Sequence, residues 1–286
     1  YAISLGLVGS EMCIRDSSMG SPNNINLKID HWLNSIRLNT RAGAEAPANL
    51  LSLDSILDEM RLLKTEEELS LMRKAGQITC DAHVRAIKRV KPGMYEYQLE
   101  AEYIHSFISN GARFPAYNPI IGGGNNACIL HYTENNSKLR DGDLVLVDAG
   151  CEYEHYAADL TRTFPVRGRY TPQQRDLYEI VLRAQIEAIR AASHGADFNA
   201  PNNSAIRLLT EALIDLGILD GDFYEAIDPE SYKRFTVHNW SHWLGIDVHD
   251  VGDYRVGDQW RALEAGMVIT VEPGLYIPDI ASFKDV

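Results

Sequence analysis

The chain carries nearly the same twelve-residue pattern twice, and this repeat limits the possible folds more than any other feature. The copies are LRDGDLVLVDAG at 139–150 and LEAGMVITVEPG at 263–274. In each copy a glycine precedes an apolar, β-rich run, and the run ends in a carboxylate: Asp148 in the first copy and Glu272 in the second. A strand that delivers an acid, made twice in one chain, indicates two half-domains that build one shared site. The repeat therefore predicts a metal centre or an acid–base centre.

The composition excludes several classes of partner. The chain has 286 residues, with 27 Lys and Arg against 40 Asp and Glu, which gives a net charge of -13. This charge opposes binding to nucleic acids and to anionic membranes, and no apolar run approaches the roughly 18 residues that a membrane span needs. The four cysteines contain no Cys-x-x-Cys pair, so neither a disulfide framework nor a zinc ribbon is indicated. We expect a cytoplasmic protein with no nucleic-acid or membrane partner.

Three segments differ in character along the chain. Residues 1–17 show neither helical nor strand periodicity and resemble a translated sequencing adaptor, so we expect them to be non-native, with a mobile native N-terminus as the alternative. Residues 18–63 combine a short apolar-periodic piece with a Gly/Ala/Pro stretch, which indicates the remnant of an N-terminal domain and a linker. Residues 64–286 form the predicted main domain.

Start and stop signals within the main domain predict interspersed helices and strands. A capping box at Thr65 and Glu68 opens a long helix that ends at Lys91-Pro92-Gly93. Further helices are predicted at 95–110, from Thr171 to about 193, and at about 204–216, and β-type runs at 116–133, 143–166, 235–248 and 267–277. The pattern is typical of an α+β fold with a largely antiparallel sheet.

Asp148 and Asp159 are the first candidate pair. A hairpin with Tyr153-Glu154 as its two-residue turn would place them directly opposite one another, with Cβ atoms about 4.5–5.5 Å apart. Two carboxylates at that separation repel, whereas divalent cations roughly 3.5–4 Å apart would bind both. Tyr-Glu is a poor primed turn, so a bulged loop stays open. The alternative is two acids on a solvated hairpin.

Histidines gather in the segment 238–250. His238, His242 and His249 are three of the nine histidines of the chain. The first two are four residues apart, which on a helix would give a metal-binding face, but the Trp-rich, β-branched context favours an extended path. We expect one imidazole to be a ligand and the others to line the pocket. Satisfied core histidines are the alternative.

Two further candidates lie outside that segment. Glu272 precedes Pro273-Gly274, so its strand must end there and leave the carboxylate at the rim of the sheet. An exposed turn acid is the alternative. His131 follows a glycine run that matches no phosphate-binding loop, and by itself it is unremarkable.

Five segments together resemble the pita-bread metallopeptidases, and within that family most closely the bacterial Xaa-Pro aminopeptidase (aminopeptidase P) branch: 131–135, 147–150, 159–165, 241–252 and 271–276. The resemblance runs from about residue 29 to 278. It implies a pita-bread (creatinase/aminopeptidase) fold, in which a pseudo-twofold antiparallel sheet is covered by helices. It also implies two divalent metal ions, most often Mn²⁺, on two Asp, one His and two Glu.

Carried over by position, the resemblance assigns roles to individual residues. Asp148, Asp159, His242 and Glu272 would be metal ligands, and either Glu272 or the missing Glu would move the proton of the attacking water. His249 would donate to the developing oxyanion, while His131 and His238 would orient the substrate. The fifth ligand, a Glu, is expected beyond residue 278. The chain ends at residue 286, before the family's last strands. Truncation at both ends is therefore expected.

The function that the resemblance implies is removal of the N-terminal residue from peptides with proline at position two, by attack of a metal-bridging hydroxide. It also implies a homo-oligomer for the full-length protein. Because a ligand is missing, we expect this chain to be weakly active or inactive. The alternatives are an Xaa-Pro dipeptidase (prolidase) and a non-catalytic peptide-binding member of the same fold.

Overall fold

The computed structural model describes residues 25–39, 41, 54–220, 232–236 and 238–277. The chain divides into two compact units, 1–59 and 60–286. The first contains helix α1 (Ile25–Leu38), and α2 (Asp54–Leu62) runs across the boundary. The predicted non-native segment 1–17 lies outside the described residues. Among the helices that are described, none is long and apolar enough to cross a membrane.

Helices α3 (Glu66–Arg89) and α4 (Glu96–Ser109) begin and end where the sequence predicts. The Thr65 hydroxyl accepts from the Glu68 backbone N–H at 3.3 Å, and the Glu68 carboxylate accepts from the Thr65 N–H at 2.7 Å, which completes the predicted capping box. Gly111 follows α4 with a φ of 92°, a conformation that favours glycine. Both helices pack on the strands through a core that includes Ile78, Tyr103 and Val147.

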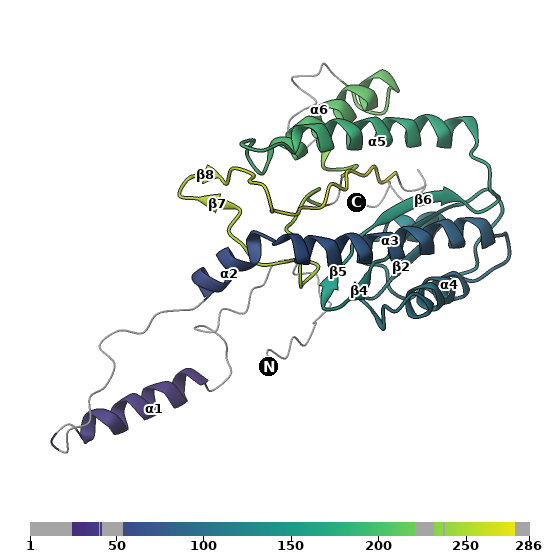
Figure 1. Cartoon of the computed structure of the whole chain (residues 1–286). Coiled ribbons are helices and arrows are strands. Elements are labelled where there is room, and N and C mark those ends of the chain that lie inside the picture. Colours follow the sequence, from purple (N-terminus) through teal and green to yellow (C-terminus); the bar gives the residue numbers. More distant parts are fainter. Residues whose placement is uncertain (1–24, 40, 42–53, 221–231, 237, 278–286) are drawn as a thin grey trace. The chain divides into compact units, whose positions relative to one another are not determined.

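Helices α5 (Pro172–Ala191) and α6 (Ala200–Asp215) form a second pair. The Thr171 hydroxyl caps α5, as predicted, with Pro172 in the first helical position. Helix α6 begins four residues before the predicted start because Pro201 lies in its first turn, where proline is tolerated. The pair packs against Trp240 and Val271. Figure 1 shows the C-terminal segment, in yellow, running between this pair and the layer of α3 and the strands.

The described strands pair only antiparallel. One sheet has the order β1 (Phe114–Pro115), β4 (Cys151–Tyr153), β5 (Tyr156–Ala157), and another has the order β2 (Ile120–Gly123), β3 (Leu144–Asp148), β6 (Thr161–Pro165). A short 3₁₀ helix, Gly124–Cys128, follows β2, and β7 (Arg255–Val256) and β8 (Gln259–Trp260) form a separate hairpin. The predicted α+β class with antiparallel sheets is confirmed.

The predicted register of the acid-bearing hairpin is wrong by two residues. Tyr153 pairs with Tyr156, so the turn is Glu154-His155, and both turn residues have positive φ, 49° and 71°. A turn with two positive φ values matches the strand twist, although it is made here without glycine. Asp148 therefore faces Thr161 rather than Asp159. An even shift keeps the same face, so Asp159 still lies on the face of Asp148, one diagonal position away.

Both copies of the sequence repeat begin with the same turn. Gly142 and Gly266 have φ values of 91° and 97°. In the first copy the Asp143 N–H donates to the Arg140 carbonyl at 3.3 Å, and in the second the Met267 N–H donates to the Glu264 carbonyl at 3.1 Å. A positive φ at the third position of such a turn requires glycine or a similar residue. The repeat in sequence is thus a repeat in backbone conformation at this turn.

The second copy pairs less regularly than predicted. Its partner is the segment 240–244, and the described contacts are one isolated bridge, Trp243 with Ile269, and three backbone bonds in the same register. These run from Leu244, Thr270 and Glu272 N–H to the carbonyls of Val268, His242 and Trp240, at 2.9–3.0 Å. The predicted β-runs at 235–248 and 267–277 therefore form a loose antiparallel pair rather than regular strands.

Candidate metal centre

Asp148 is the last residue of β3, and Asp159 lies two residues before β6 begins. Between them the hairpin narrows at Gly150, where a Cβ atom would lie 1.7 Å from the Ala158 carbonyl oxygen. Only glycine fits such a close approach of two backbones. The Tyr117 hydroxyl lies within hydrogen-bond distance of both carboxylates, with a short contact to Oδ1 of Asp148 and 3.0 Å to Oδ1 of Asp159, and its single proton is donated to one of them at a time. The two acids thus share one half-buried hydroxyl.

His242 and Glu272 come from the loosely paired second copy and its neighbour. Thr270 joins them: its hydroxyl accepts from the His242 backbone N–H at 3.0 Å and donates to Oε1 of Glu272 at 2.9 Å. Nδ1 of His242 donates to the Trp243 carbonyl at 2.9 Å. This bond leaves Nε2 as the atom directed at the acids, in the arrangement typical of ligating imidazoles.

The two halves meet at His242. Its Nε2 lies 3.2 Å from Oδ2 of Asp159 and 3.2 Å from Oε1 of Glu272. Donor atoms of all three residues lie within 4.8 Å of one another. Asp148 joins this group through Tyr117. The structure therefore brings together the four residues that the sequence analysis singled out as metal ligands.

The electrostatics of the cluster call for positive charge. Burial and then the negative charge of Asp159 raise the pKa of Asp148 to about 8. Burial lowers the pKa of His242, but its hydrogen bonds to Asp159 and Glu272 outweigh this and raise it to about 10. Carboxylates packed this closely are stable only when protons or cations neutralise them.

The donor set fits divalent metal ions. Three carboxylates and one imidazole nitrogen, all half-buried, are ligands that Mn²⁺, Zn²⁺ and related ions take. Each ligand is also held from behind: Asp148 and Asp159 by Tyr117, Glu272 by Thr270, and His242 by the Trp243 carbonyl. Such outer hydrogen bonds orient ligands before an ion binds. The fifth carboxylate that the resemblance implies falls outside the described residues.

The other predicted histidines surround this cluster. The His249 ring lies 4.4 Å from the His242 ring, centroid to centroid, at an angle of 82°. Partial burial and the neighbouring His242 lower the pKa of His249, and His131 is close enough to contribute to the same shift. Nε2 of His238 accepts from the Tyr276 hydroxyl at 2.9 Å. Burial and the charges of Asp148 and Glu272 raise the pKa of Tyr276, which shows that this tyrosine also adjoins the cluster.

A fully buried carboxylate, Glu96, fixes the loop that begins at His131. Its Oε1 accepts from the Gly123 N–H at 2.9 Å and from Asn126 at 3.0 Å. Its Oε2 accepts from the Tyr132 hydroxyl and the Ser137 N–H, each at 2.8 Å. Four donors satisfy the charge without water. His131, the first residue of this loop, has a φ of 54°.

Sequence reasoning missed Tyr117, Thr270 and Glu96. The sequence could have indicated Thr270, because a residue two positions before Glu272 on an extended strand points to the same face. No comparable signal marks Tyr117 or Glu96, since both reach the site from distant elements. Their roles depend on contacts that only the fold creates.

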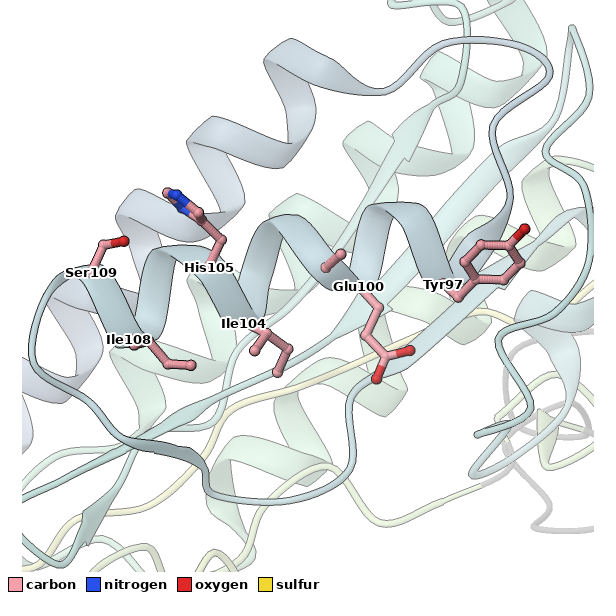
Figure 2. A pocket seen from close by; sticks show the side chains of 7 residues that line it. Tyr97, Glu100, Ile104, His105, Ile108 and Ser109 are labelled. Atoms are coloured by element: carbon pink, nitrogen blue, oxygen red, sulfur yellow. The ribbon is translucent and has the colours of Figure 1, made fainter.

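A separate hollow of about 560 Å³ lies along one face of α4. Figure 2 shows its side chains spaced along that single helix, from Tyr97 to Ser109. None of the predicted site residues lines it. It therefore contributes nothing to the metal centre.

Comparisons with known proteins agree on one family. Residues 70–285 match the model of metallopeptidase family M24. The chain is 50% identical over 252 residues to Xaa-Pro aminopeptidase of Escherichia coli, which covers 88% of this chain and 57% of the relative.

Solved structures give the same result. The structure of Pseudomonas aeruginosa aminopeptidase PepP matches with a TM-score of 0.89 and 45% identity, over 92% of this chain and 60% of that one. A zinc-substituted E. coli aminopeptidase P in complex with product matches with a TM-score of 0.86 and 47% identity, over 91% and 59%. The chain thus spans less than two thirds of each of these relatives.

Proposed function

The chain belongs to metallopeptidase family M24, and on that premise we propose that it supplies the metal centre of an Xaa-Pro aminopeptidase. The reaction is removal of the first residue from peptides that have proline at position two. One observation carries the proposal: donor atoms of Asp159, His242 and Glu272, from two halves of the domain, lie within 4.8 Å of one another. The identity of 50% to an Xaa-Pro aminopeptidase supports the choice of substrate.

The ligand set divides evenly between the halves. Asp148 and Asp159 come from the first half, and His242 and Glu272 from the second. Together they would hold two divalent ions, and Mn²⁺ is the ion we expect. Bound there, such ions would polarise the scissile carbonyl and make a water molecule more acidic.

The remaining steps belong to side chains of the site. The Glu272 carboxylate takes the proton of the attacking water and delivers it to the leaving nitrogen. The lowered pKa of His249 keeps its ring neutral at pH 7, so that it donates one N–H to the oxygen on which charge develops. His238, held at Nε2 by Tyr276, and His131 line the side on which the peptide lies.

The substrate itself imposes two requirements. The nitrogen of an Xaa-Pro bond carries no hydrogen, so the site must recognise the shape of the ring rather than a backbone donor. The free amino group must lie beside the cluster, and because two divalent ions outweigh the charge of three carboxylates, it does so in its neutral form. Both requirements are met by a short peptide that enters with its amino terminus toward the acids.

Cleavage of a proline-containing tripeptide and of the matching dipeptide, with Mn²⁺ and with a chelator, tests the proposal in the whole protein. We expect the tripeptide to lose its first residue only when metal is present. Faster cleavage of the dipeptide would instead identify a dipeptidase. Metal binding without cleavage of either peptide would identify a non-catalytic peptide-binding protein.

The 286 residues alone are expected to turn over peptide slowly. Four protein ligands are few for two divalent ions, each of which prefers six or so donor atoms. We therefore propose that this chain alone cleaves far more slowly than a chain extended with the C-terminal part of the E. coli relative. Equal rates for the two would contradict this.

A further inference from the structure

The segment that joins His242 to His249 closes on itself. We call residues 243–250 the 243–250 loop. The Asp250 N–H donates to the Trp243 carbonyl at 3.0 Å, and the Gly245 N–H donates to the Asp247 carbonyl at 3.1 Å. His242 directly precedes the loop and His249 is its second-last residue, which explains why residues seven apart in sequence have rings 4.4 Å apart. The shape of this loop therefore sets the position of one imidazole against the other.

An ion-pair cluster fixes the end of the loop at Asp250. Asp250 is buried, and its Oδ2 accepts from Nζ of Lys64 at 3.1 Å, with both side chains 1% exposed. Its Oδ1 accepts a short bond from Nη2 of Arg61, and the same Nη2 donates to Oδ2 of the exposed Asp247 at 2.7 Å. A buried carboxylate is stable only with such full pairing, and loss of one partner leaves a charge without compensation.

The Asp250 carboxylate touches the backbone of the loop directly. A Cβ atom on Gly245 would lie 2.0 Å from Oδ2 of Asp250 and 3.0 Å from Cε of Lys64. The Gly245 carbonyl, in turn, accepts from the Ala157 N–H at 2.8 Å, on the hairpin that carries Asp159. The Asp250 carboxylate is therefore packed against the loop backbone, and movement toward Gly245 would displace that backbone.

Lys64 connects the loop to the second copy of the repeat. Its backbone N–H donates to the Gly266 carbonyl at 2.9 Å, in the turn that precedes the segment bearing Glu272. The same residue therefore binds Asp250 through its side chain and the Glu272 segment through its backbone.

From these contacts we infer that Asp250, held by Lys64 and Arg61, is a positioning residue that sets His249 against His242. Asp250 adjoins His249 in sequence and does not reach the four proposed ligands itself. The inference rests on the proposed function for its kinetic consequence, because it takes His249 to be the donor to the oxyanion. The geometric consequence, a fixed His242–His249 distance, does not depend on that function.

The test compares Asp250→Asn with Asp247→Asn in the whole, metal-loaded protein. Asp247 binds the same guanidinium but is 51% exposed, so it is the matched control. For Asp250→Asn we expect kcat to fall by about 10- to 100-fold, as misplacement of a catalytic group by a fraction of an ångström to 1 Å does. KM and bound metal should stay within about threefold of the original, because the ligands are not touched. Asp247→Asn should behave like the unchanged protein.

Two outcomes would overturn the inference while the proposed function stands. One is a kcat for Asp250→Asn equal to that for Asp247→Asn. The other is loss of metal together with activity, which would mean that Asp250 supports the whole site rather than His249. If the unchanged protein does not cleave Xaa-Pro peptides, the proposed function fails and crystal structures decide the inference. A longer His242–His249 distance in Asp250→Asn supports it, and an unchanged 4.4 Å overturns it.

A second variant covers failure of Asp250→Asn to fold. Lys64→Met replaces the buried ammonium with an apolar side chain of similar length, and Arg61 still pairs with the Asp250 carboxylate, so the buried charge keeps one cation. We expect a smaller fall in kcat than for Asp250→Asn, again with KM and metal content preserved. Full activity of a folded Lys64→Met variant, with the rings still 4.4 Å apart, would overturn the inference.

Discussion

The acid-bearing run of the first copy is hydrogen-bonded to a strand on each side, whereas that of the second has fewer backbone bonds and relies in addition on a side chain. Strand β3, which ends at Asp148, is hydrogen-bonded to β2 on one side and to β6 on the other. Among the described residues, the run that ends in Glu272 pairs with one segment, 240–244, through three backbone bonds and one isolated bridge. The Thr270 hydroxyl and the Lys64 backbone make up for the missing bonds.

This difference predicts where each half is vulnerable. The first half should lose stability when a substitution forces its paired backbones apart, or when a buried side chain that supports it becomes charged. The second half should respond to loss of single polar side chains. Both halves must stay in place for the site, since His242 touches acids from both.

The largest effect should come from removing the residue at which the halves meet. His242→Ala deletes the imidazole that faces Asp159 and Glu272. A bound ion supplies several kcal/mol of transition-state stabilisation, so cleavage should fall on the order of 10³-fold. Steady-state kinetics with excess Mn²⁺ measure the loss. Unchanged cleavage would show that the reaction does not use this site.

Within the first half, a steric clash at the backbone should cause the largest loss of unfolding free energy. In Gly150→Ala the new Cβ would lie 1.7 Å from the Ala158 carbonyl oxygen. Overpacking against backbone should lower the free energy of unfolding by about 3 kcal/mol or more, as measured by urea titration. Gly76→Ala, in helix α3 with no atom within 4 Å of the new Cβ, is the control and should add about 0.5–1 kcal/mol. Equal effects of the two would contradict the account.

Low pH should weaken the first half through His83. This histidine of α3 donates to the Leu160 carbonyl, next to Asp159, at 3.0 Å and accepts from the Tyr103 hydroxyl at 2.9 Å. Burial lowers its pKa from 6.5 to about 4. The folded state therefore prefers the neutral ring, so this contribution is complete above pH 6.5 and is lost as the pH falls through about 4.

The expected loss from His83 is up to about 3 kcal/mol of unfolding free energy. Urea titrations between pH 7 and pH 4 measure it in the original protein and in His83→Gln, whose amide also donates but does not titrate. The variant should lose less stability over this range. Identical pH dependence of the two proteins would show that His83 does not support the hairpin in its neutral form.

The second half should be sensitive to a single hydroxyl. Thr270→Val removes the group that accepts from His242 N–H and donates to Glu272. Groups behind metal ligands typically contribute 10- to 100-fold to metal affinity, so Mn²⁺ binding by calorimetry should weaken by about tenfold or more. Thr270→Ser keeps the hydroxyl and should bind nearly as well. Unchanged affinity in Thr270→Val would mean that the backbone bonds of the second half position His242 and Glu272 without the hydroxyl.

The sequence was most informative where local rules decide the structure. The capping box at Thr65, the cap at Thr171 and the repeat ending in Asp148 and Glu272 depend on neighbours a few residues away. The two helix starts and the shared glycine turn of the repeat are confirmed. The hairpin register was wrong because Glu154 and His155 adopt positive φ without glycine, so the turn lacked its usual signal. The face of Asp159 was still correct because the error was two residues.

The supporting shell could not be predicted in the same way. Tyr117, Glu96 and Lys64 act on residues 27 to 186 positions away. No periodicity or motif links such distant positions, because packing alone brings them together. The roles of the predicted ligands and histidines themselves stay proposals.

Anomalous scattering from crystals soaked in Mn²⁺ tests the central claim most directly, namely that the two halves share one metal centre. We expect anomalous peaks at bonding distance, about 2.0–2.3 Å, from carboxylate oxygens of Asp148, Asp159 and Glu272 and from Nε2 of His242. Peaks confined to other acidic residues, or none at these four, would contradict the account.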